Sequence, residues 1–568
     1  MKNLFITITL AAAMTAAQAQ KTITLDAPGT LHENIAESEK YNITELKITG
    51  PLNGTDVILL RDMAGTDLDN NTTEGQLARL DLSGAQMKAG GEPYYTDYNS
   101  MTDYSTADNE MSDMIFFNCQ ALRSVTLPET ATAIGSGAFK NCSQLSEVTL
   151  PPVLEEIRSE ALAGTAVTAF AFPDGVMPSE GVLKNCSQLV EVTLPAGCTE
   201  IPASAFSGTG LTAVELPQGL LKIGEDAFGG SQLASVTMPV TLREIGDGAF
   251  MMCSQLAVIN LNDGLESIGS SAFSWCDALT SVTIPNSVTA IGSGAFSVCE
   301  SLAEAQLPES LTEISESMFD RCGSLQKINV PEGLVRIGGY AFQNNTMLAE
   351  FTIPESVTEI GDYAFSNTAL AEIVLPKGLT SIGRSAFSGC GNAQRIVLPE
   401  ALTEIPDNAF TYCEAVKEVT VNEGVTAIGR MAFAQCLSME RLTLPSSLAT
   451  IGQMTFAMND NLTEVHCLGP VPATCEAGAF KTSTGDVPEG CTLYVPEGSK
   501  EAYEAASTWS SFTDIRENGG TGISLNPTPE TRRETMRLDA SGRRINGTRS
   551  GINIIVYDDG TVKKTTIR

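Results

Sequence analysis

The stretch SVTIPNSVTAIGSGAF, residues 281–296, returns in close variants along most of the chain. Three of these variants are SVTMPVTLREIGDGAF (235–250), EFTIPESVTEIGDYAF (350–365) and EVTVNEGVTAIGRMAF (418–433). The phenylalanine that ends the phrase recurs at constant spacing, as Phe250, Phe273, Phe296, Phe319, Phe342 and Phe365. Because a constant period of this length is typical of stacked repeat units, the sequence predicts one elongated repeat architecture rather than several unrelated domains.

One repeat aligns as F-x-x-C-x-x-L-x-x-V-x-L-P-x-x-L-x-x-I-G-x-x-A. Apolar and polar residues alternate in its L-x-x-V-x-L part, which predicts a short strand. The proline that follows, for example Pro285, lacks a backbone N–H and therefore ends the strand. We expect the alanine and phenylalanine that close each coil to point inward. The glycine of the I-G step, as in Gly269, Gly292 and Gly361, predicts either a tight or a left-handed backbone.

No single coil of this kind can bury its own apolar side, whereas stacked coils bury one continuous column of apolar side chains. We expect about sixteen strands, centred from Val125 to Val465, in a parallel sheet about 75 Å long. The predicted fold is a leucine-rich repeat solenoid of about 23-residue coils, with its parallel β-sheet on the concave face and a small all-β appendage at the C-terminus.

These motifs resemble those of the BspA-type leucine-rich repeat family of bacterial cell-surface proteins. The resemblance covers about residues 116–480 and is carried by I-G-x-x-A-F and L-x-x-V-x-L-P. LARLDLSGAQM (77–87) resembles the irregular repeat that opens such arrays, and CTLYVPEGSKEAYEAASTWSSF (491–512) resembles their terminal cap. The packing residues expected in this cap are Tyr494, Tyr503, Trp509 and Phe512. The resemblance implies a secreted or surface-displayed protein, and some members of the family bind host extracellular proteins or other bacteria.

The N-terminal segment 1–19 combines Lys2, a short apolar run and the small-residue site Ala17-Gln18-Ala19, which predicts a secretory signal peptide. The apolar run is too short to span a membrane. The expected order of parts is a signal peptide at 1–19, N-terminal irregular repeats and cap at 20–115, the repeat array at 116–480, a C-terminal cap at 481–515, a linker at 516–529 and a β domain at 530–568.

In the last part, MRLDA, INIIVY and TVKKTTIR are predicted to form three short strands. The spacing of Gly542-Arg543, Gly551-Ile552 and Asp559-Gly560 resembles the C-terminal sorting domains of the type IX secretion route. This resemblance implies transport across the outer membrane, with the tail then cut or lipid-linked. A small β appendage without a role in export is the alternative.

Ten of the fourteen cysteines occupy one column, three residues after the phenylalanine or its equivalent. They are Cys119, Cys142, Cys186, Cys253, Cys276, Cys299, Cys322, Cys390, Cys413 and Cys436. Asn345 and Asn459 hold the same place in two other coils, and asparagine cannot form a disulfide but can hydrogen-bond to the backbone. We therefore interpret the column as structural residues that hydrogen-bond to the turn from inside the coil.

Four coils lack the cysteine or asparagine and have a turn that is one residue shorter. They carry Thr165, Thr209, Ser231 and Thr368 instead. Outside the column, Cys467 and Cys475 are close enough in sequence to form a disulfide, and the sequence leaves this open.

The chain has two histidines, His32 and His466, and no phosphate-cradling, G-x-S-x-G or H-E-x-x-H motif. We therefore predict no enzyme activity and no cofactor. Asp67, Asp69 and Asn71 alternate like the start of a calcium loop, but the later positions exclude an EF-hand and leave only looser Ca²⁺ binding open. The net charge of −34 argues against nucleic acid as a partner and disfavours an anionic membrane surface.

The polar position before the central strand residue alternates in charge along successive coils, apart from one pair of adjacent glutamates. It reads Glu304, Lys327, Glu350, Glu372, Arg395, Glu418, Arg441 and Glu464. Side chains in these places on neighbouring strands are expected to form ion pairs. The other exposed position is rich in threonine, as in Thr283 and Thr420. The two rows either only solvate and pair the sheet or also form a flat docking face for a protein partner.

Neither row contains an aromatic residue. Aromatic residues gather instead in the insert GEPYYTDYNSMTDYSTADNEM (91–111), at Tyr94, Tyr95, Tyr98 and Tyr104. Tyrosines beside serines and acidic residues suit an adaptable binding loop. The alternative is a cap that covers the open end of the first coil.

These features predict a non-catalytic solenoid that is secreted or displayed on the bacterial outer membrane, without a transmembrane segment. The leading function is adhesion through capture of a host or bacterial protein. The alternative is a structural spacer that holds another part away from the cell surface.

Overall fold

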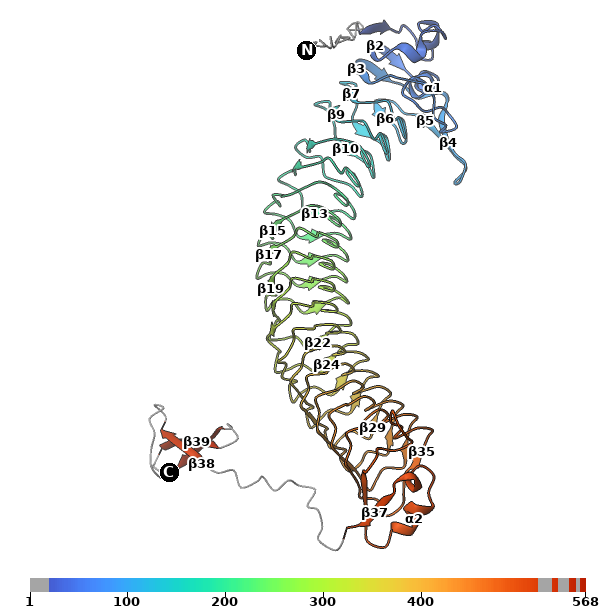
Figure 1. Ribbon diagram of the computed structural model, residues 1–568. Coiled ribbons are helices and arrows are strands. Elements are labelled where there is room, and N and C mark those ends of the chain that lie inside the picture. The colour runs from blue at the N-terminus through green and yellow to red at the C-terminus, as the bar shows by residue number, and fades with distance from the viewer. Residues whose placement is uncertain (1–19, 519–533, 540–550, 558–561, 568) are drawn as a thin grey trace, which may run out of the picture.

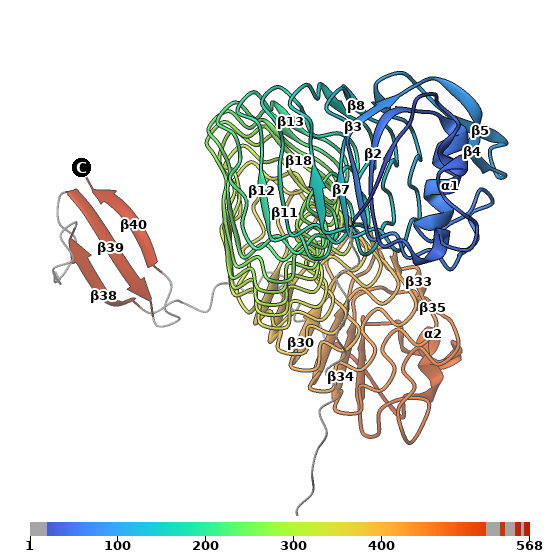
Figure 2. The ribbon, with the colours of Figure 1, turned by 90° about the horizontal axis from the view of Figure 1, so that it is seen from above.

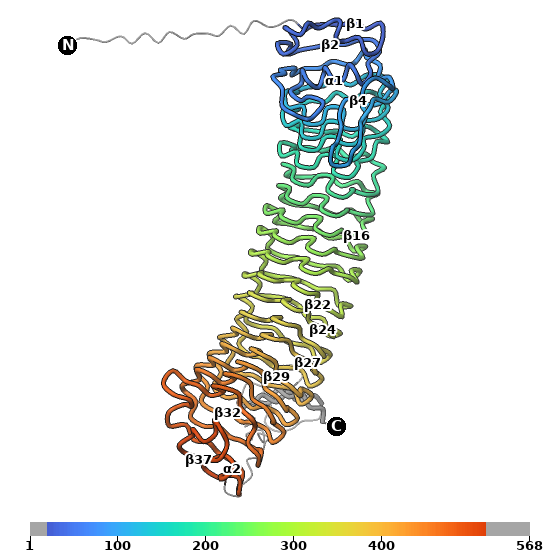
Figure 3. Tube along the Cα trace, turned by 90° about the vertical axis from the view of Figure 1, so that its right-hand side faces the viewer, coloured from blue at the N-terminus to red at the C-terminus, as the bar shows by residue number. Residues whose placement is uncertain are grey.

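The computed structural model describes residues 20–518, 534–539, 551–557 and 562–567. The repeats form one long, bent solenoid (Figure 1), and the coils follow similar outlines when the solenoid is seen from above (Figure 2). In the side view of Figure 3 the coils lie one above another from the N-terminal to the C-terminal end. The predicted solenoid of parallel strands and its predicted repeat length are confirmed. The predicted signal peptide, residues 1–19, lies outside the described residues.

The predicted strand of each repeat contributes to a first ladder of parallel strands. Its members are β7 (Ser124–Thr126), β9 (Glu147–Thr149), β11 (Ala169–Ala171), β12 (Glu191–Thr193), β15 (Ser235–Thr237), β17 (Val258–Asn260), β19 (Ser281–Thr283), β21 (Glu304–Gln306), β23 (Lys327–Ile328), β26 (Glu372–Val374), β28 (Arg395–Val397), β30 (Glu418–Thr420), β32 (Arg441–Leu444) and β34 (Glu464–Cys467). Two of the expected segments, around Val214 and Phe351, are not strands. The first ladder is divided into separate sheets of two to five strands, at these two segments and also between β9 and β11, between β17 and β19 and between β28 and β30.

A second parallel ladder runs along the I-G step of the repeats and was not predicted. Its two-residue strands are β6 (Glu110–Met111), β8 (Ala133–Ile134), β10 (Glu156–Ile157), β13 (Glu200–Ile201), β14 (Lys222–Ile223), β16 (Glu244–Ile245), β18 (Ser267–Ile268), β20 (Ala290–Ile291), β22 (Glu313–Ile314), β24 (Arg336–Ile337), β25 (Glu359–Ile360), β27 (Ser381–Ile382), β29 (Glu404–Ile405), β31 (Ala427–Ile428), β33 (Thr450–Ile451) and β35 (Thr474–Cys475). In most of them the isoleucine is buried. The sequence does not reveal these strands because two residues are too few to show an alternating pattern.

The N-terminal part extends the first ladder with irregular coils. Strands β1 (Lys21–Thr24), β2 (Glu45–Leu52) and β3 (Arg79–Met87) pair in parallel and continue into β7. Beside them lie η1 (Leu31–Glu33), η2 (Lys40–Asn42), α1 (Gly54–Met63) and the antiparallel pair β4 (Gly90–Asp97) and β5 (Thr102–Thr106). Asn53 caps α1, since its side chain accepts a hydrogen bond from the Thr55 backbone N–H at 3.1 Å.

The C-terminal end of the array is covered by a small cap. It consists of β36 (Thr492–Val495), α2 (Lys500–Ala505), η3 (Trp509–Ser511) and β37 (Asp514–Glu517). Tyr503, Trp509 and Phe512 are buried as expected, and the Trp509 ring lies 5.4 Å from the ring of Phe480 in the last coil. Tyr494 is only partly buried. The cap therefore covers apolar surface that the last coil would otherwise expose.

The predicted C-terminal strands are present as β38 (Glu534–Asp539), β39 (Gly551–Tyr557) and β40 (Val562–Ile567). They form an antiparallel sheet in the order β38-β39-β40.

A column of stacked phenylalanine rings runs through the centre of the solenoid. From Phe206 to Phe480 the ring centroids of neighbouring coils are 5.1–5.8 Å apart and the ring planes are within 20° of parallel. These side chains are fully buried. Burial of one such side chain contributes about 1.5–3 kcal/mol. The inward orientation predicted for the alanine and phenylalanine is confirmed.

The cysteine column lies beside the rings and joins neighbouring coils. The thiol of Cys276 donates a hydrogen bond to the carbonyl of Phe250 at 3.3 Å. Asn345 donates through its side-chain amide to the carbonyl of Phe319 at 3.1 Å, and Asn459 makes the equivalent bond. The hydrogen-bonding interpretation is confirmed, but each acceptor belongs to the preceding coil. The column therefore ties coils together instead of closing a turn within one coil.

The I-G glycines permit close approach of neighbouring coils, and Gly269, Gly292 and Gly361 do not have positive φ. A Cβ atom on Gly292 would lie 2.3 Å from the backbone nitrogen of Ser270 in the preceding coil, and one on Gly269 would lie 2.5 Å from that of Asp247. Of the two predicted alternatives, the tight backbone is therefore correct for these three glycines and the left-handed backbone is wrong.

The replacement Cys276→Leu is expected to lower the free energy of unfolding by about 1–3 kcal/mol. The larger side chain overpacks the interior and leaves the Phe250 carbonyl without its donor. Cys276→Asn is expected to cost less, because Asn345 fills the same place in another coil. Urea unfolding of the three proteins checks this, and equal stability of the leucine variant and the natural protein would contradict the role of the column.

Candidate functional site

The strand face, meaning the outward side of the first ladder, carries the two predicted rows of polar side chains. In β30 the central Val419 is buried, whereas Glu418 and Thr420 on either side are exposed. The parallel register sets equivalent residues of adjacent strands side by side, as for Glu372 and Arg395. The charged row, Glu304 to Glu464 as defined above, is thus a regular array on exposed backbone.

Ion pairs form in the C-terminal half of the charged row. Arg441 lies 3.5 Å from Glu418 on one side and 3.0 Å from Glu464 on the other. Arg395 lies 3.8 Å from Glu372. These five residues neutralise one another in part, and exposed pairs of this kind contribute about 0–1 kcal/mol each.

The N-terminal half of the charged row remains without such pairs. Glu304 and Lys327 are register partners on β21 and β23, yet no ion pair joins them among the described residues. Glu350 lies in the segment that is not a strand. All three border a hollow of about 460 Å³. Their charges are therefore available to a partner.

The threonine row ends in two stacked aromatic rings that were not predicted. Thr443 is paired in register with His466, and His466 with Tyr494, whose ring centroid lies 4.6 Å from that of the histidine. Hydrogen bonds from His466 and Arg441 hold the pKa of Glu464 below its usual range. Only the parallel pairing of β34 with β36 in the cap places Tyr494 in the row, and the sequence shows no sign of that pairing.

The tyrosine-rich insert packs largely against the N-terminal part. Tyr94 is buried and its hydroxyl donates a hydrogen bond to a backbone carbonyl at 2.5 Å. Tyr95 is also buried, with its ring 5.5 Å from that of Tyr104. The interpretation of Tyr94 and Tyr95 as surface residues for a ligand is corrected, because their buried rings contribute to the core of the N-terminal cap. Tyr104 is partly buried, and Tyr98 is 62% exposed.

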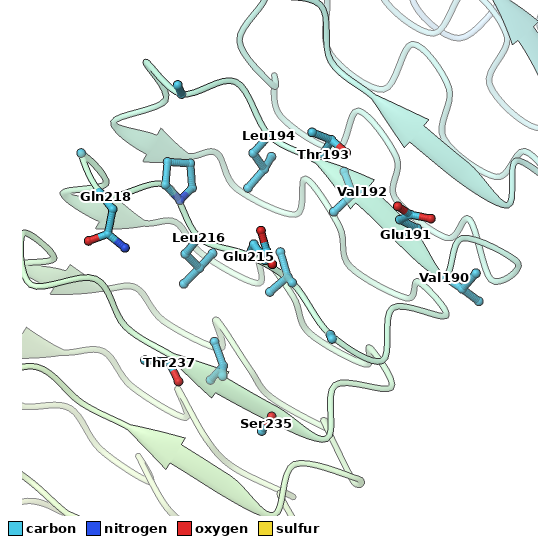
Figure 4. A pocket seen from close by; sticks show the side chains of 16 residues that line it. Val190, Glu191, Val192, Thr193, Leu194, Glu215, Leu216, Gln218, Ser235 and Thr237 are labelled. Carbon is cyan, nitrogen blue, oxygen red and sulfur yellow. The ribbon is translucent and has the colours of Figure 1, made fainter.

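A hollow of about 1030 Å³ lies where the first ladder is interrupted around Val214 (Figure 4). It is bordered by β12 on one side and β15 on the other, and Val192, Leu194 and Leu216 line it together with Glu215. Strand β12 pairs only with β11, and β15 only with β17. The backbone N–H groups of residues 213–216 donate no hydrogen bond within the described part of the chain. The hollow thus combines apolar side chains with free backbone groups.

The interruption around Val214 follows one of the four short turns, the turn with Thr209. After each of the four short turns, the following segment does not pair with the strand of the preceding coil: these segments are β11, the one around Val214, β15 and β26. Parallel pairing needs aligned segments, so loss of one turn residue draws the next segment out of line. The missing cysteine or asparagine before Val214 is therefore a sequence feature that accompanies the hollow, although the ladder is also divided after full-length turns, between β17 and β19 and between β28 and β30.

The second ladder carries ion pairs of its own, which were also not predicted. Arg336 lies 2.5 Å from Glu313 and 3.4 Å from Glu359, and Lys222 lies 3.1 Å from Glu244. Both outward faces of the coils therefore display charged rows.

The acidic loop at residues 66–71 satisfies its own polar groups. Asp67 accepts a hydrogen bond from the backbone N–H of Asn71 at 2.7 Å, and Asp69 accepts one from the Tyr98 hydroxyl at 2.7 Å. Among the described residues no group of three or more His, Cys, Asp or Glu side chains is placed to hold a metal ion.

The fourteen cysteines are free thiols, including Cys467 and Cys475, whose pairing the sequence left open. Burial raises the pKa of the column thiols, to about 11 for Cys390 and to about 12 for Cys436. A thiol with a raised pKa is a poor nucleophile near neutral pH. The column therefore has the properties of interior packing.

The stacked coils, their phenylalanine column and the exposed strand face define a leucine-rich repeat solenoid. Matches to the BspA type Leucine rich repeat region (6 copies) extend over residues 109–233, 179–285, 221–349, 266–394 and 380–484. Together they span about two-thirds of the chain. The chain belongs to the BspA-type leucine-rich repeat family.

Several solved structures are similar to the chain. A leucine-rich repeat protein from Bacteroides ovatus is 23% identical, with 73% of this chain and 89% of that chain covered and a TM-score of 0.44. A leucine rich cell surface protein from Faecalibacterium prausnitzii is 23% identical, with 70% and 89% covered and a TM-score of 0.31. The pneumococcal vaccine antigen PcpA is 16% identical, with 79% and 87% covered and a TM-score of 0.30. No curated protein matches the chain.

Within the part of the chain that the structure describes, no helix combines the length and the apolar character that crossing a membrane requires.

The replacement Arg441→Glu is expected to destabilise the protein more than Arg395→Glu. Arg441 lies between two glutamates at ion-pair distance and Arg395 beside one, and each like-charged neighbour costs about 0.2–1 kcal/mol at low salt. High salt should remove most of the difference. Urea unfolding at low and high NaCl measures it, and identical midpoints at low salt would show that the row does not stabilise the sheet.

Proposed function

We propose that the chain is a non-catalytic, secreted or surface-displayed solenoid that binds a protein and acts as an adhesin for a host or bacterial partner. The strand face carries this proposal. Where neighbouring strands pair, it presents two rows of polar side chains about 4.8 Å apart. A regular exposed surface of this kind, built on a rigid stack, is what repeat proteins use for protein recognition.

The charged row and the hollow give the strand face features that a partner could recognise. Glu304, Lys327 and Glu350 have no ion-pair partner among the described residues, so binding need not break an existing pair. The hollow around Val214 adds apolar side chains and free backbone N–H groups. Apolar contact with a few oriented polar groups is the usual composition of a specific interface.

The net charge of −34 supports a protein partner over nucleic acid, because nucleic-acid recognition needs a positive surface. The predicted signal peptide and the resemblance of the C-terminal tail to sorting domains support display at the outer membrane. The description of the Faecalibacterium prausnitzii protein as a cell surface protein agrees with this location.

A structural spacer is the second candidate function. The continuous phenylalanine column and the hydrogen bonds between coils favour it, because they make a long body that needs no ligand for its stability. An adhesin requires saturable binding of a defined partner, whereas a spacer requires only the length of the array.

Binding of the full-length chain to a panel of purified plasma and extracellular-matrix proteins and to intact bacteria tests the first function. We expect saturable binding of one component. The variant Lys327→Glu should weaken that binding at least about tenfold, since it reverses a charge that no internal partner neutralises. The exposed Lys377→Glu, outside the charged row, is the matched control. Absence of saturable binding, together with loss of display when coils are removed, would favour the spacer.

Deletion of residues 530–568 tests the tail separately. The solenoid should melt at the same temperature, because the predicted linker at 516–529 separates the tail from the repeat array. In the native bacterium the truncated protein should fail to reach the cell surface, as measured by protease accessibility of intact cells. Normal surface exposure of the truncated protein would remove the sorting role.

A further inference from the structure

One position in every coil, directly before the cysteine column, has a left-handed backbone. Asparagine and glycine, the residues best suited to this conformation, occupy it in most coils. These residues are Asn118, Asn141, Gly164, Asn185, Gly208, Gly230, Asn344, Asn367 and Gly389, with φ between 58° and 78°.

The exceptions to this preference form two uninterrupted runs instead of being scattered. The first run is Met252, Trp275, Val298 and Arg321, and the second is Tyr412, Gln435 and Met458, all with φ between 58° and 62°. Bulky residues are disfavoured in this conformation, and a β-branched residue such as Val298 is a marked outlier. Bulky residues such as Tyr340 and Tyr363 also have positive φ at a second position of the coil, so exposure, and not φ alone, distinguishes the first run.

In the first run Met252 and Trp275 form an exposed apolar surface on two adjacent coils, whereas Val298 is buried. The backbone N–H of Met252 donates to the Ser274 carbonyl at 2.8 Å, and that of Trp275 to the Ser297 carbonyl at 2.9 Å, so the coils are in direct contact. The Met252 side chain is 54% exposed and the Trp275 side chain 45% exposed. Met252 and Trp275 are thus only partly buried on a backbone that disfavours them, which points to a role outside the solenoid.

Unpaired carboxylates lie beside this surface. Asp277 follows Trp275 by two residues, and Glu300 holds the equivalent place in the next coil. No ion pair or side-chain hydrogen bond neutralises either of them within the described residues, and the Oδ1 atom of Asp277 is buried without a partner. Partial burial and the proximity of Glu300 both raise the pKa of Asp277. A cation placed here would relieve this repulsion.

We propose that Met252 and Trp275, together with Asp277 and Glu300, form a docking surface for an extended cationic segment of a partner protein. An arginine or lysine of that segment stacks on the Trp275 ring and pairs with the two carboxylates. Cations are attracted to the face of an indole ring, and the attraction is strongest where solvent is partly displaced. This surface lies on the turn and not on the strand face, so it is independent of the function proposed above.

The test uses the full-length chain and a capped peptide, Ser-Arg-Ser-Arg-Ser, at near-physiological salt. Alternate arginines of an extended peptide lie on one side, about 6.8 Å apart. Of the two tryptophans, Trp509 is 1% exposed, so quenching by acrylamide reports on Trp275. We expect saturable binding that protects Trp275 from acrylamide, and weaker binding, by about tenfold, when citrulline replaces both arginines.

The variant Trp275→Asn is expected to lose the peptide while melting at least as high as the natural protein, because asparagine suits the left-handed backbone. Tyr412→Asn is the matched control, because it relieves the same backbone strain in the second run. This variant should bind the peptide normally. Loss of binding with a raised or unchanged melting temperature separates recognition from folding.

The double variant Asp277→Asn, Glu300→Gln decides the matter without a change at Trp275. It should weaken peptide binding, whereas Asp486→Asn, Glu489→Gln, which removes two charges in the C-terminal cap, should not. Three outcomes would overturn the proposal: no saturable binding by the natural protein, equal binding by the two double variants, or equal loss of binding in Tyr412→Asn and Trp275→Asn.

Discussion

The contact between one coil and the next holds the whole solenoid together. A phenylalanine ring stacks on the ring of the neighbouring coil, and beside it a thiol or an amide donates a hydrogen bond to the carbonyl of the preceding phenylalanine. The ring supplies buried apolar area and the hydrogen bond fixes the height of each coil. Because the same contact recurs, residues elsewhere in the coil are free to vary, and the outward faces can serve recognition.

The sides of the coil do not share this regularity equally. The ring column continues without a break from Phe206 to Phe480, whereas the first ladder is divided at each short turn. The hollow around Val214 follows the short turn at Thr209, whereas the divisions between β17 and β19 and between β28 and β30 follow full-length turns. A rigid interior therefore coexists with a variable surface in the same coil.

The sequence predicted the features that follow from periodicity, namely the stacked coils, the first strand and the inward phenylalanine, and the asparagines at 345 and 459 revealed the bonding role of the cysteines. The second ladder was not predicted because two-residue strands are too short to show an alternation of apolar and polar residues. The burial of Tyr94 depends on long-range packing that no local motif records. The surface at Trp275 was not predicted because a positive φ cannot be read from one residue. The asparagines and glycines at the same position of the other coils could have indicated a left-handed backbone there.

The repeated contact also makes length a discrete property of the protein. Removing one whole repeat from a regular part of the array, for example the stretch 274–296, would bring two coils together that offer each other the same ring, donor and acceptor. The gene can therefore shorten or lengthen the array by whole coils without a new core having to arise.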